Sequence, residues 1–343
     1  MITRHFGDNF AVQDFTQELA MVPNIRTPLS DLNLFRSESI STTSVTFEQT
    51  FGTLGLISDV YRGGQVLANS DETRKLHTYA VPYFKVVDRL TAADIQGVRA
   101  YGTADQAETQ AAALESKMKR MKRSALMTSE YSKFYAITQG RIYSPSGAVA
   151  HSSFYTDFGV SRKEIDFNLD VGTTDVLAKI EEAVAHVQDN LLSGDVYSGL
   201  VCLCSPEFFA ALISHVKVVS AYTYYSSTQE PLRNRLGGNT TLHREFQYGG
   251  VLFREIRDGV HNGTTTTRFI GTDEAYFLPL GTEDTFVSYW APSNKLDLAN
   301  TLGEEMYLFQ RKNANGESLD LELEFSQVHL LRRPQAIVKA TRT

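Results

Sequence analysis

The clearest periodic pattern of apolar residues lies between residues 104 and 138. Small and apolar side chains recur there at spacings of four and three, which traces one stripe along a helix: Ala107, Ala111, Leu114, Met118, Met121 and Ala125. Gly140 follows as a helix-ending residue. At 1.5 Å per residue such a helix is about 50 Å long. The pattern predicts a spine that crosses an elongated subunit; a dimerising coiled coil competes, although Ala and Met make poor zipper seams.

Two segments before this helix cannot bury their apolar side chains alone. Residues 1–42 carry short apolar-spaced pieces interrupted by Pro23 and Pro28, and a short helix is expected to begin at Pro28. Residues 43–90 have the alternation of extended strands, with a Gly63-Gly64 turn and few large apolar residues near it. We expect an arm followed by a long β-loop, both packing on neighbouring molecules.

Beyond the long helix the patterns alternate between strands and helices, which indicates an α+β fold class. The expected elements are strand and hairpin at 141–170, a helix capped at Thr173 or Thr174 and ending near Gly194, a buried strand at 200–204, a helix led by Ser205-Pro206-Glu207, an exposed loop at 222–248, and strands at 249–257, 268–271 and 274–279. No internal repeat is visible.

The sharpest strand alternation is near the end of the chain. Leu319, Leu321, Leu323 and Phe325 alternate with Asp320, Glu322 and Glu324. Three carboxylates could suggest a metal site, but the polar face of an amphipathic strand is the favoured interpretation. An apolar stretch from Val328 to Val338 follows, interrupted by Arg332-Arg333-Pro334.

The composition indicates the class of protein but not its function. The 343 residues carry a net charge of −7 and are 42% hydrophobic, which suits a globular protein whose main task is not gripping nucleic acid. No apolar run approaches the roughly 18 residues that span a bilayer. The N-terminus shows no secretory signal pattern. We expect a protein made in the cytosol that stays soluble until it assembles, with no membrane partner.

The sequence lacks the common motifs of catalytic, phosphate-binding and metal-binding sites. The sequence has no Gly-rich phosphate loop, no two-His metal motif and no Gly-x-Ser-x-Gly elbow, and its eight histidines are scattered. Cys202 and Cys204 fall on one face of a strand and are interpreted as small buried hydrophobes. We therefore expect no catalytic residue, no cofactor and no metal, and a protein that is not an enzyme.

Two groups of basic residues allow more than one interpretation. The long helix carries Lys117, Lys119, Arg120, Lys122 and Arg123. A solvated helix face is favoured, and a surface that touches DNA or a scaffold is the alternative. Arg332 and Arg333 are expected either to bridge subunits or to be exposed.

The order of these parts carries a resemblance. The residues behind it are Ile25–Phe35, Thr42–Glu48, Pro82, Gly140-Arg141-Ile142, Phe269–Leu280 and the strand from Ser318. Over nearly its whole length the chain resembles the lambda-type major capsid proteins of tailed bacteriophages, the phage capsid protein E family. The resemblance implies the Hong-Kong-97-type capsid fold.

That resemblance also implies a division of the chain. The expected parts are an N-terminal arm (1–42), an extended β-loop (43–90), a peripheral domain with the spine helix (91–172), an axial domain (173–295) and return strands that complete the peripheral domain (296–343). The implied inter-subunit contacts are Pro28, Leu32, Phe35, Arg62, Gly63, Gly64, Arg332 and Arg333.

The implied function is self-assembly into hexamers and pentamers of an icosahedral shell that encloses double-stranded DNA and expands on packaging. A separate scaffolding protein, a portal, a small decoration protein and weak non-specific DNA contacts are the implied partners. Host cytoplasm and then the virion capsid are the implied locations. The alternatives are an encapsulin-like nanocompartment subunit, a tail-tube or connector protein, and an enzyme whose site forms only in space.

Overall fold

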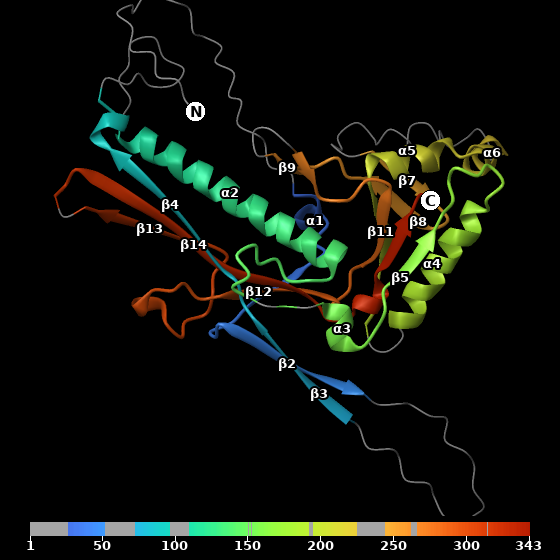
Figure 1. Cartoon of the computed structure of the whole chain (residues 1–343), viewed down its shortest axis with the longest axis horizontal. Helices are drawn as coiled ribbons and strands as arrows, with labels where there is room; N and C mark the ends of the chain where they lie inside the picture. The colour runs from blue at the N-terminus through green and yellow to red at the C-terminus, as the bar shows by residue number, and fades with distance from the viewer. Residues whose placement is uncertain are drawn as a thin grey trace, which may run out of the picture.

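The computed structural model describes residues 27–51, 73–96, 110–149, 151, 153–191, 195–224, 244–261, 266–313 and 315–343. They form two mixed regions side by side, one around a long helix and one around a second sheet with its own helices (Figure 1). A two-stranded hairpin extends away from both regions. The mixture of helices and strands confirms the α+β class.

The first region is a five-stranded sheet whose central strand is β14 (Ser318–Leu331). Strand β4 (Tyr83–Thr91) runs antiparallel along one side of β14. Along the other side of β14, strand β13 (Tyr307–Lys312) pairs with its first part and strand β12 (Phe286–Ala291) pairs with its last part. Strand β1 (Arg36–Ser39), which belongs to the predicted arm, adds to β12 in parallel.

The long helix α2 (Gln110–Gln139) lies over this sheet (Figure 1). Its 30 residues span about 45 Å at 1.5 Å per residue. Met121 and Ala125 are buried against apolar side chains of β14, so the stripe that predicted the helix is the face that packs. Residues 97–109, where the sequence predicts the helix to begin, lie outside the described part of the chain.

The second region is a six-stranded sheet. Its order is β5 (Lys163–Asp166), β15 (Val338–Thr341), β11 (Glu274–Leu280), β6 (Gly199–Cys204), β8 (Val251–Glu255) and β7 (Glu245–Tyr248). Helices α4 (Val176–Leu191) and α5 (Pro206–Ser214) pack on it, and α6 (Val216–Tyr224) follows α5. Both faces of the sheet are buried, because Cys202 and Cys204 join the core under α4 and α5 whereas Val201 and Leu203 join the core shared with α2.

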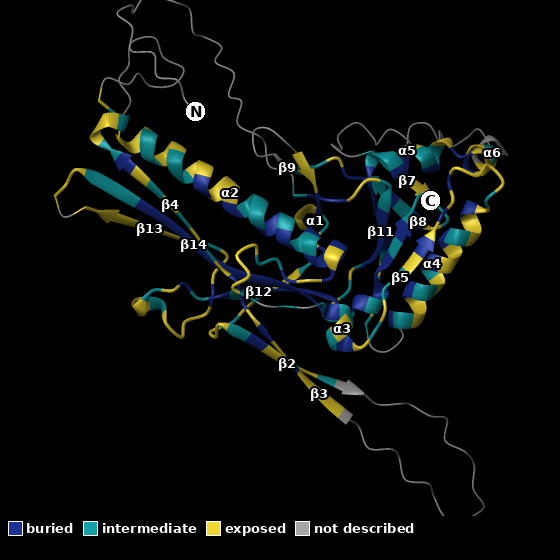
Figure 2. Ribbon diagram, viewed as in Figure 1, coloured by how far each residue is buried: buried dark blue, intermediate teal, exposed yellow. Residues whose placement is uncertain are grey.

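Strands β2 (Ser44–Phe51) and β3 (Thr73–Ala80) form the projecting hairpin. Among the described residues they pair only with each other. Many of their side chains are exposed (Figure 2). The predicted tip residues Arg62, Gly63 and Gly64 lie outside the described residues.

Short elements complete the described chain. They are α1 (Pro28–Asp31), α3 (Phe154–Phe158), β9 (Gly259–His261), β10 (Thr266–Arg268), and the 3-10 helices η1 (Ala92–Asp94), η2 (Leu296–Leu298) and η3 (Pro334–Ala336). Helix α1 begins at Pro28 as predicted.

Three local predictions were wrong. Strand β5 confirms the strand part of the prediction for 141–170, but helix α3 takes the place of the expected hairpin, because the Ser153 side chain accepts the Tyr155 N–H and Gly159 ends the helix in a left-handed conformation. The loop expected at 222–248 ends in strand β7. The second helix is capped by Asp175, whose carboxylate accepts the Ala178 N–H, and not by Thr173 or Thr174.

Long-range strand pairing also crosses the predicted domain boundaries. Strand β12 falls inside the predicted axial domain but pairs with β14, while β5 and β15 fall outside it but join the second sheet. Strand β4 falls in the predicted β-loop yet lies against β14. Local patterns do not specify which distant strand a strand will pair with. The division into axial and peripheral domains stays a prediction.

Candidate functional site

The predicted arm is seated on its own subunit by a buried carboxylate. Glu130 lies in helix α2 and is 1% exposed. Its Oε1 accepts the backbone N–H of Leu29 at 2.6 Å and that of Ser30 at 3.4 Å, and its Oε2 accepts the Ser30 hydroxyl at 2.7 Å. These are N–H groups of the first turn of α1, which have no partner within the helix. Glu130 therefore caps the arm helix from outside.

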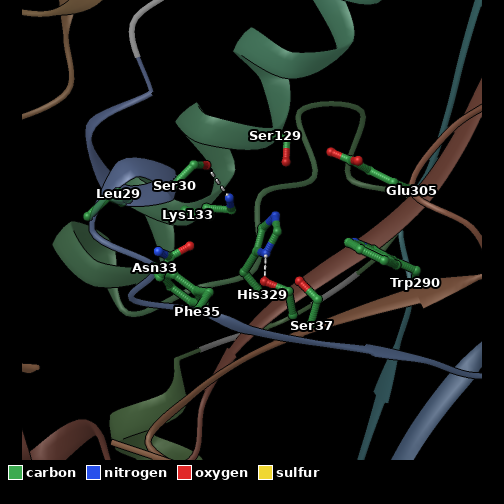
Figure 3. A pocket seen from close by; sticks show the side chains of 11 residues that line it. Leu29, Ser30, Asn33, Phe35, Ser37, Ser129, Lys133, Trp290, Glu305 and His329 are labelled. Atoms are coloured by element: carbon green, nitrogen blue, oxygen red, sulfur yellow. Dashed lines mark hydrogen bonds between the residues drawn. The ribbon is translucent and has the colours of Figure 1, made fainter. Parts of the chain in front are cut away.

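Aromatic side chains hold the rest of the arm on the subunit. We call the residues that contact the arm here the arm seat. The Phe35 ring makes edge contacts with Phe286 and His329, at centroid distances of 5.5 and 5.6 Å. Beside them lies a cavity of about 180 Å³, lined by residues of the arm, α2, β12 and β14 and by Glu305 of the segment before β13 (Figure 3). Lys133, which also lines the cavity, donates to the Ser30 hydroxyl at 2.7 Å. Five separate stretches of the chain therefore meet here.

His329 is a second buried titratable group beneath the arm, after Glu130. Its Nδ1 shares a hydrogen bond of 2.7 Å with the Ser288 hydroxyl, while Nε2 has no hydrogen-bond partner in the described chain. Burial, and then the charge of Lys133, lower the pKa of His329 well below its usual value. The ring is therefore neutral at pH 7, and protonating it under the arm is unfavourable.

A second polar cluster anchors the hairpin to the body. The Asp157 carboxylate accepts the Tyr79 hydroxyl at 3.0 Å and lies 2.9 Å from His151 Nε2. Lys75 donates to the Asp157 carbonyl at 2.5 Å. Burial, followed by the charge and hydrogen bond of Asp157, raises the pKa of Tyr79 far above its ordinary value. Tyr79 stays a neutral donor at neutral pH, and the cluster fixes the base of the hairpin.

Arg332 and Arg333 meet at the junction of the hairpin and the two sheets. Arg332 pairs with Asp284 at 3.0 Å and lies over the Phe47 ring of β2, 5.4 Å from its centroid. Arg333 pairs at 3.0 Å with Asp195, which follows α4 and has a 2% exposed side chain. Within this subunit both arginines are partly buried and paired. Their predicted role between subunits stays a prediction.

The carboxylates of β14 form an ion network on the sheet face opposite α2. Glu322 and Glu324 are 8% and 1% exposed, so the polar face predicted for this amphipathic strand is buried at these two positions. Lys85 lies 3.3 Å from Glu322 and 3.4 Å from Glu324, and Lys295 lies 2.5 and 3.3 Å from them. Hydrogen bonding from Lys295 lowers the pKa of Glu322. The pair is neutralised by lysines and holds the loop between β12 and β13.

The basic run on α2 divides into paired and unpaired members. Lys117 and Arg120 both bind Asp88 of β4, at 3.1 and 2.6 Å. Lys119 pairs with Glu115 one turn away. Lys122 and Arg123 are exposed and form no ion pair in the described ranges. Lys117 and Arg120 tie the helix to the sheet, whereas Lys122 and Arg123 are the exposed members of the run without an ion pair among the described residues.

The structure thus gathers several predicted residues but not around one centre. Pro28 is buried and Leu32 and Phe35 are half-buried on their own subunit. Glu130, His329 and Asp195 were not predicted from the sequence, because single polar residues form no motif and only the structure shows that these side chains are buried. No group of three metal-binding side chains occurs among the described residues, and no described helix is long and apolar enough to cross a membrane.

Comparisons with known proteins agree with the architecture. The major capsid protein of Pseudomonas phage KPP10 is 36% identical over 340 residues, covering 97% of both chains. The major capsid protein of Salmonella phage Felix O1 is 29% identical and covers 98% of both. The capsid structure of cyanophage P-SCSP1u matches with a TM-score of 0.57 at 12% identity, over 96% of this chain and 92% of that one. The structural match shows the Hong-Kong-97-type capsid fold.

A family profile gives the assignment. The profile described as "Phage major capsid protein E" matches residues 11–342, almost the whole sequence. The same residues supply the arm seat, the hairpin, the long helix and both sheets. The chain therefore belongs to the phage major capsid protein E family.

Proposed function

We propose that this protein is the major head subunit of a tailed phage and assembles into hexamers and pentamers of an icosahedral shell around double-stranded DNA. The observation that carries the proposal is the hairpin β2–β3, which leaves the body and pairs with no further strand in the described chain. A two-stranded ribbon is marginal by itself in water. Contact with a neighbouring copy would bury it. Family membership supplies the same expectation.

The proposed mechanism of shell expansion gives different roles to different parts of the subunit. Helix α2 and strand β14 form a stiff centre, since they share one packed core. The hairpin is joined to that centre through the Asp157 cluster and through Arg332. Expansion on packaging would then reorient the hairpin while the centre and the docked part of the arm keep their packing, as a switch between two discrete arrangements.

The proposed partners follow the same reasoning. The shell itself is built from copies of this chain, and a scaffolding protein, a portal and a small decoration protein complete the proposed assembly in the host cytoplasm. Lys122 and Arg123 are the proposed contact for DNA or scaffold, because Lys117 and Arg120 are engaged with Asp88. With a net charge of −7, DNA contact should be weak and non-specific.

A structural role is favoured over the alternatives. The family and the capsid structures favour a shell subunit over a tail, connector or nanocompartment protein, and they indicate a structural and not a catalytic role. The buried polar clusters serve packing: each carboxylate described above is occupied by backbone N–H groups, hydroxyls or cations.

The test is assembly of the purified protein, followed by size-exclusion chromatography and electron microscopy. We expect closed shells of megadalton mass. Deleting residues 1–26 leaves the seated arm from Thr27 onward intact, and replacing Arg62, Gly63 and Gly64 leaves the hairpin base intact. Both variants should give folded subunits that fail to form normal shells, and normal shells from both would contradict the proposed roles of arm and loop.

A further inference from the structure

The loop between β12 and β13, residues 292–306, carries two strongly exposed leucines. Leu296 is 93% exposed and Leu302 is 68% exposed, and neither belongs to one of the three apolar cores. The loop stands away from the sheet near β13 and β14 (Figure 1), and most of it is exposed (Figure 2). We call residues 293–303 the leucine loop.

The first end of the leucine loop is fixed by the buried carboxylates of β14. Lys295 Nζ lies 2.5 Å from Glu322 and 3.3 Å from Glu324, and the Ser293 hydroxyl donates to Glu324. The Lys295 ammonium also lies 5.0 Å from the centroid of the Phe309 ring. Buried carboxylates are costly unless they are paired. Glu322 and Glu324 therefore hold Lys295 and Ser293 in place.

The second end is fixed by the backbone. Gly303 donates its N–H to the Ile40 carbonyl at 2.9 Å, and a Cβ at this position would lie 2.2 Å from the Trp290 carbonyl oxygen. The Glu304 N–H donates to the Tyr307 hydroxyl at 2.9 Å. Between the two ends the 3-10 turn of Leu296–Leu298 raises Leu296 into solvent. The two leucines are thus presented on a rigid support.

This arrangement is unusual for an isolated subunit. Single exposed apolar residues are common and need no explanation. Here two leucines share one short loop whose ends are tied to buried ions and to a close-packed glycine. A free subunit buries little of either leucine, whereas an apolar centre with a polar rim is the usual anatomy of a protein interface.

The charges around the loop select the kind of partner. Asp297 lies on the leucine loop beside Lys295, and Glu304 and Glu305 follow directly after it. Acidic side chains disfavour DNA phosphates and anionic lipid surfaces. A rim that mixes both signs suits a protein surface of similar composition, and an assembly of identical chains presents such a surface to every subunit.

We propose that the leucine loop packs against a second copy of this chain, with Leu296 and Leu302 as the apolar centre of the contact. The inference rests on the proposed function, because only a shell of identical subunits brings a second copy to this loop. It assigns the network of Glu322, Glu324 and Lys295 a positioning role: these side chains orient the loop without touching the partner.

The first experiment compares two double variants with the wild type in the shell assembly reaction. Leu296→Lys/Leu302→Lys places charges at the contact, whereas Leu296→Met/Leu302→Met keeps it apolar and of similar volume. Since neither leucine packs within the subunit, both variants should have the wild-type circular dichroism spectrum and melting temperature. We expect the lysine variant to lower shell yield by at least about tenfold and the methionine variant to assemble normally.

Shells from the lysine variant at wild-type yield and salt resistance would overturn the leucine-loop contact and leave the proposed function standing. Absence of shells from the wild type would overturn the proposed function and this inference with it. A second measurement is independent of any folding defect: a photo-reactive phenylalanine placed at position 296 in wild-type shells should give cross-linked dimers of this chain. Irradiated shells without dimers, or cross-links only to another protein, would overturn the inference.

Discussion

Glu130 of the long helix accepts the backbone N–H of Leu29 at 2.6 Å and so ties the arm to the spine within one subunit. The arm was expected to pack on neighbours, and its described part also packs on its own chain, where Leu29 is fully buried and Leu34 is 4% exposed. The docked part of the arm therefore behaves as part of the subunit core. Any contact that the arm makes with a neighbour must start from this fixed point.

Removing the Glu130 carboxylate should release the arm. Glu130→Ala leaves two N–H groups and the Ser30 hydroxyl without their acceptor, and Lys133 without its partner 3.7 Å away. We expect the free energy of unfolding of the unassembled subunit to fall by about 3 kcal/mol, as measured by urea denaturation. Glu130→Gln keeps an acceptor oxygen and should cost about 1 kcal/mol. Equal stability of the alanine variant and the wild type would contradict the capping role.

The neutral state of His329 makes the arm seat sensitive to acid. Burial lowers the folded-state pKa of His329 below the ordinary value of 6.5, so below that pH the unfolded chain binds a proton that the folded chain does not. Above pH 6.5, His329 therefore adds no pH dependence to the unfolding free energy. Below pH 6.5, His329 makes the unfolding free energy fall as the pH drops, by up to about 1.4 kcal/mol per pH unit.

The measurement is urea denaturation of the unassembled subunit between pH 7 and pH 5. His329→Gln keeps a partner for Ser288 but does not titrate, so its stability should fall less steeply with acid than that of the wild type. The other histidines with lowered pKa values, His77 and His151, are present in both proteins and cancel in the comparison. Identical slopes for the two proteins would show that His329 is not a source of acid sensitivity.

Gly303 should not tolerate a side chain. The Cβ of Gly303→Ala would lie 2.2 Å from the Trp290 carbonyl oxygen, so the loop or strand β12 must shift. We expect a loss of about 1–3 kcal/mol in the unfolding free energy. Gly199→Ala is the matched control, because nothing lies within 4 Å of its Cβ position, and it should be nearly neutral. Similar melting temperatures for both variants would count against a close-packed loop end.

The basic run on α2 should separate into two classes on mutation. Lys117 donates to the Asp88 carboxylate at 3.1 Å and to the Arg89 carbonyl at 2.8 Å, and its hydrogen bond helps to lower the pKa of Asp88 against the effect of burial. Lys117→Ala should cost about 1 kcal/mol of unfolding free energy. Lys122→Ala should change it by less than about 0.5 kcal/mol. A larger cost at Lys122 in urea denaturation would show that this residue has a structural partner.

The sequence by itself determined the elements whose signals are local. The stripe through Met121 and Ala125 specified a helix and its buried face, since the 3.6-residue period places those side chains on one side. Pro28 marked the start of α1, and the alternation of Leu321 with Glu322 specified a strand. The order of these elements also carried the family resemblance.

Only the tertiary structure decided which distant elements meet. The pairing of β4 and β12 with β14, and the docking of Leu29 on Glu130, join residues that are far apart in sequence. No local pattern encodes such a choice, because it depends on the shape and burial of surfaces that exist only once both partners have folded. The burial of Glu324 could not be predicted for the same reason. Its polar position in the alternating strand is typical of a solvent-facing residue, but in the folded subunit its carboxylate contacts Lys85, Lys295 and Ser293.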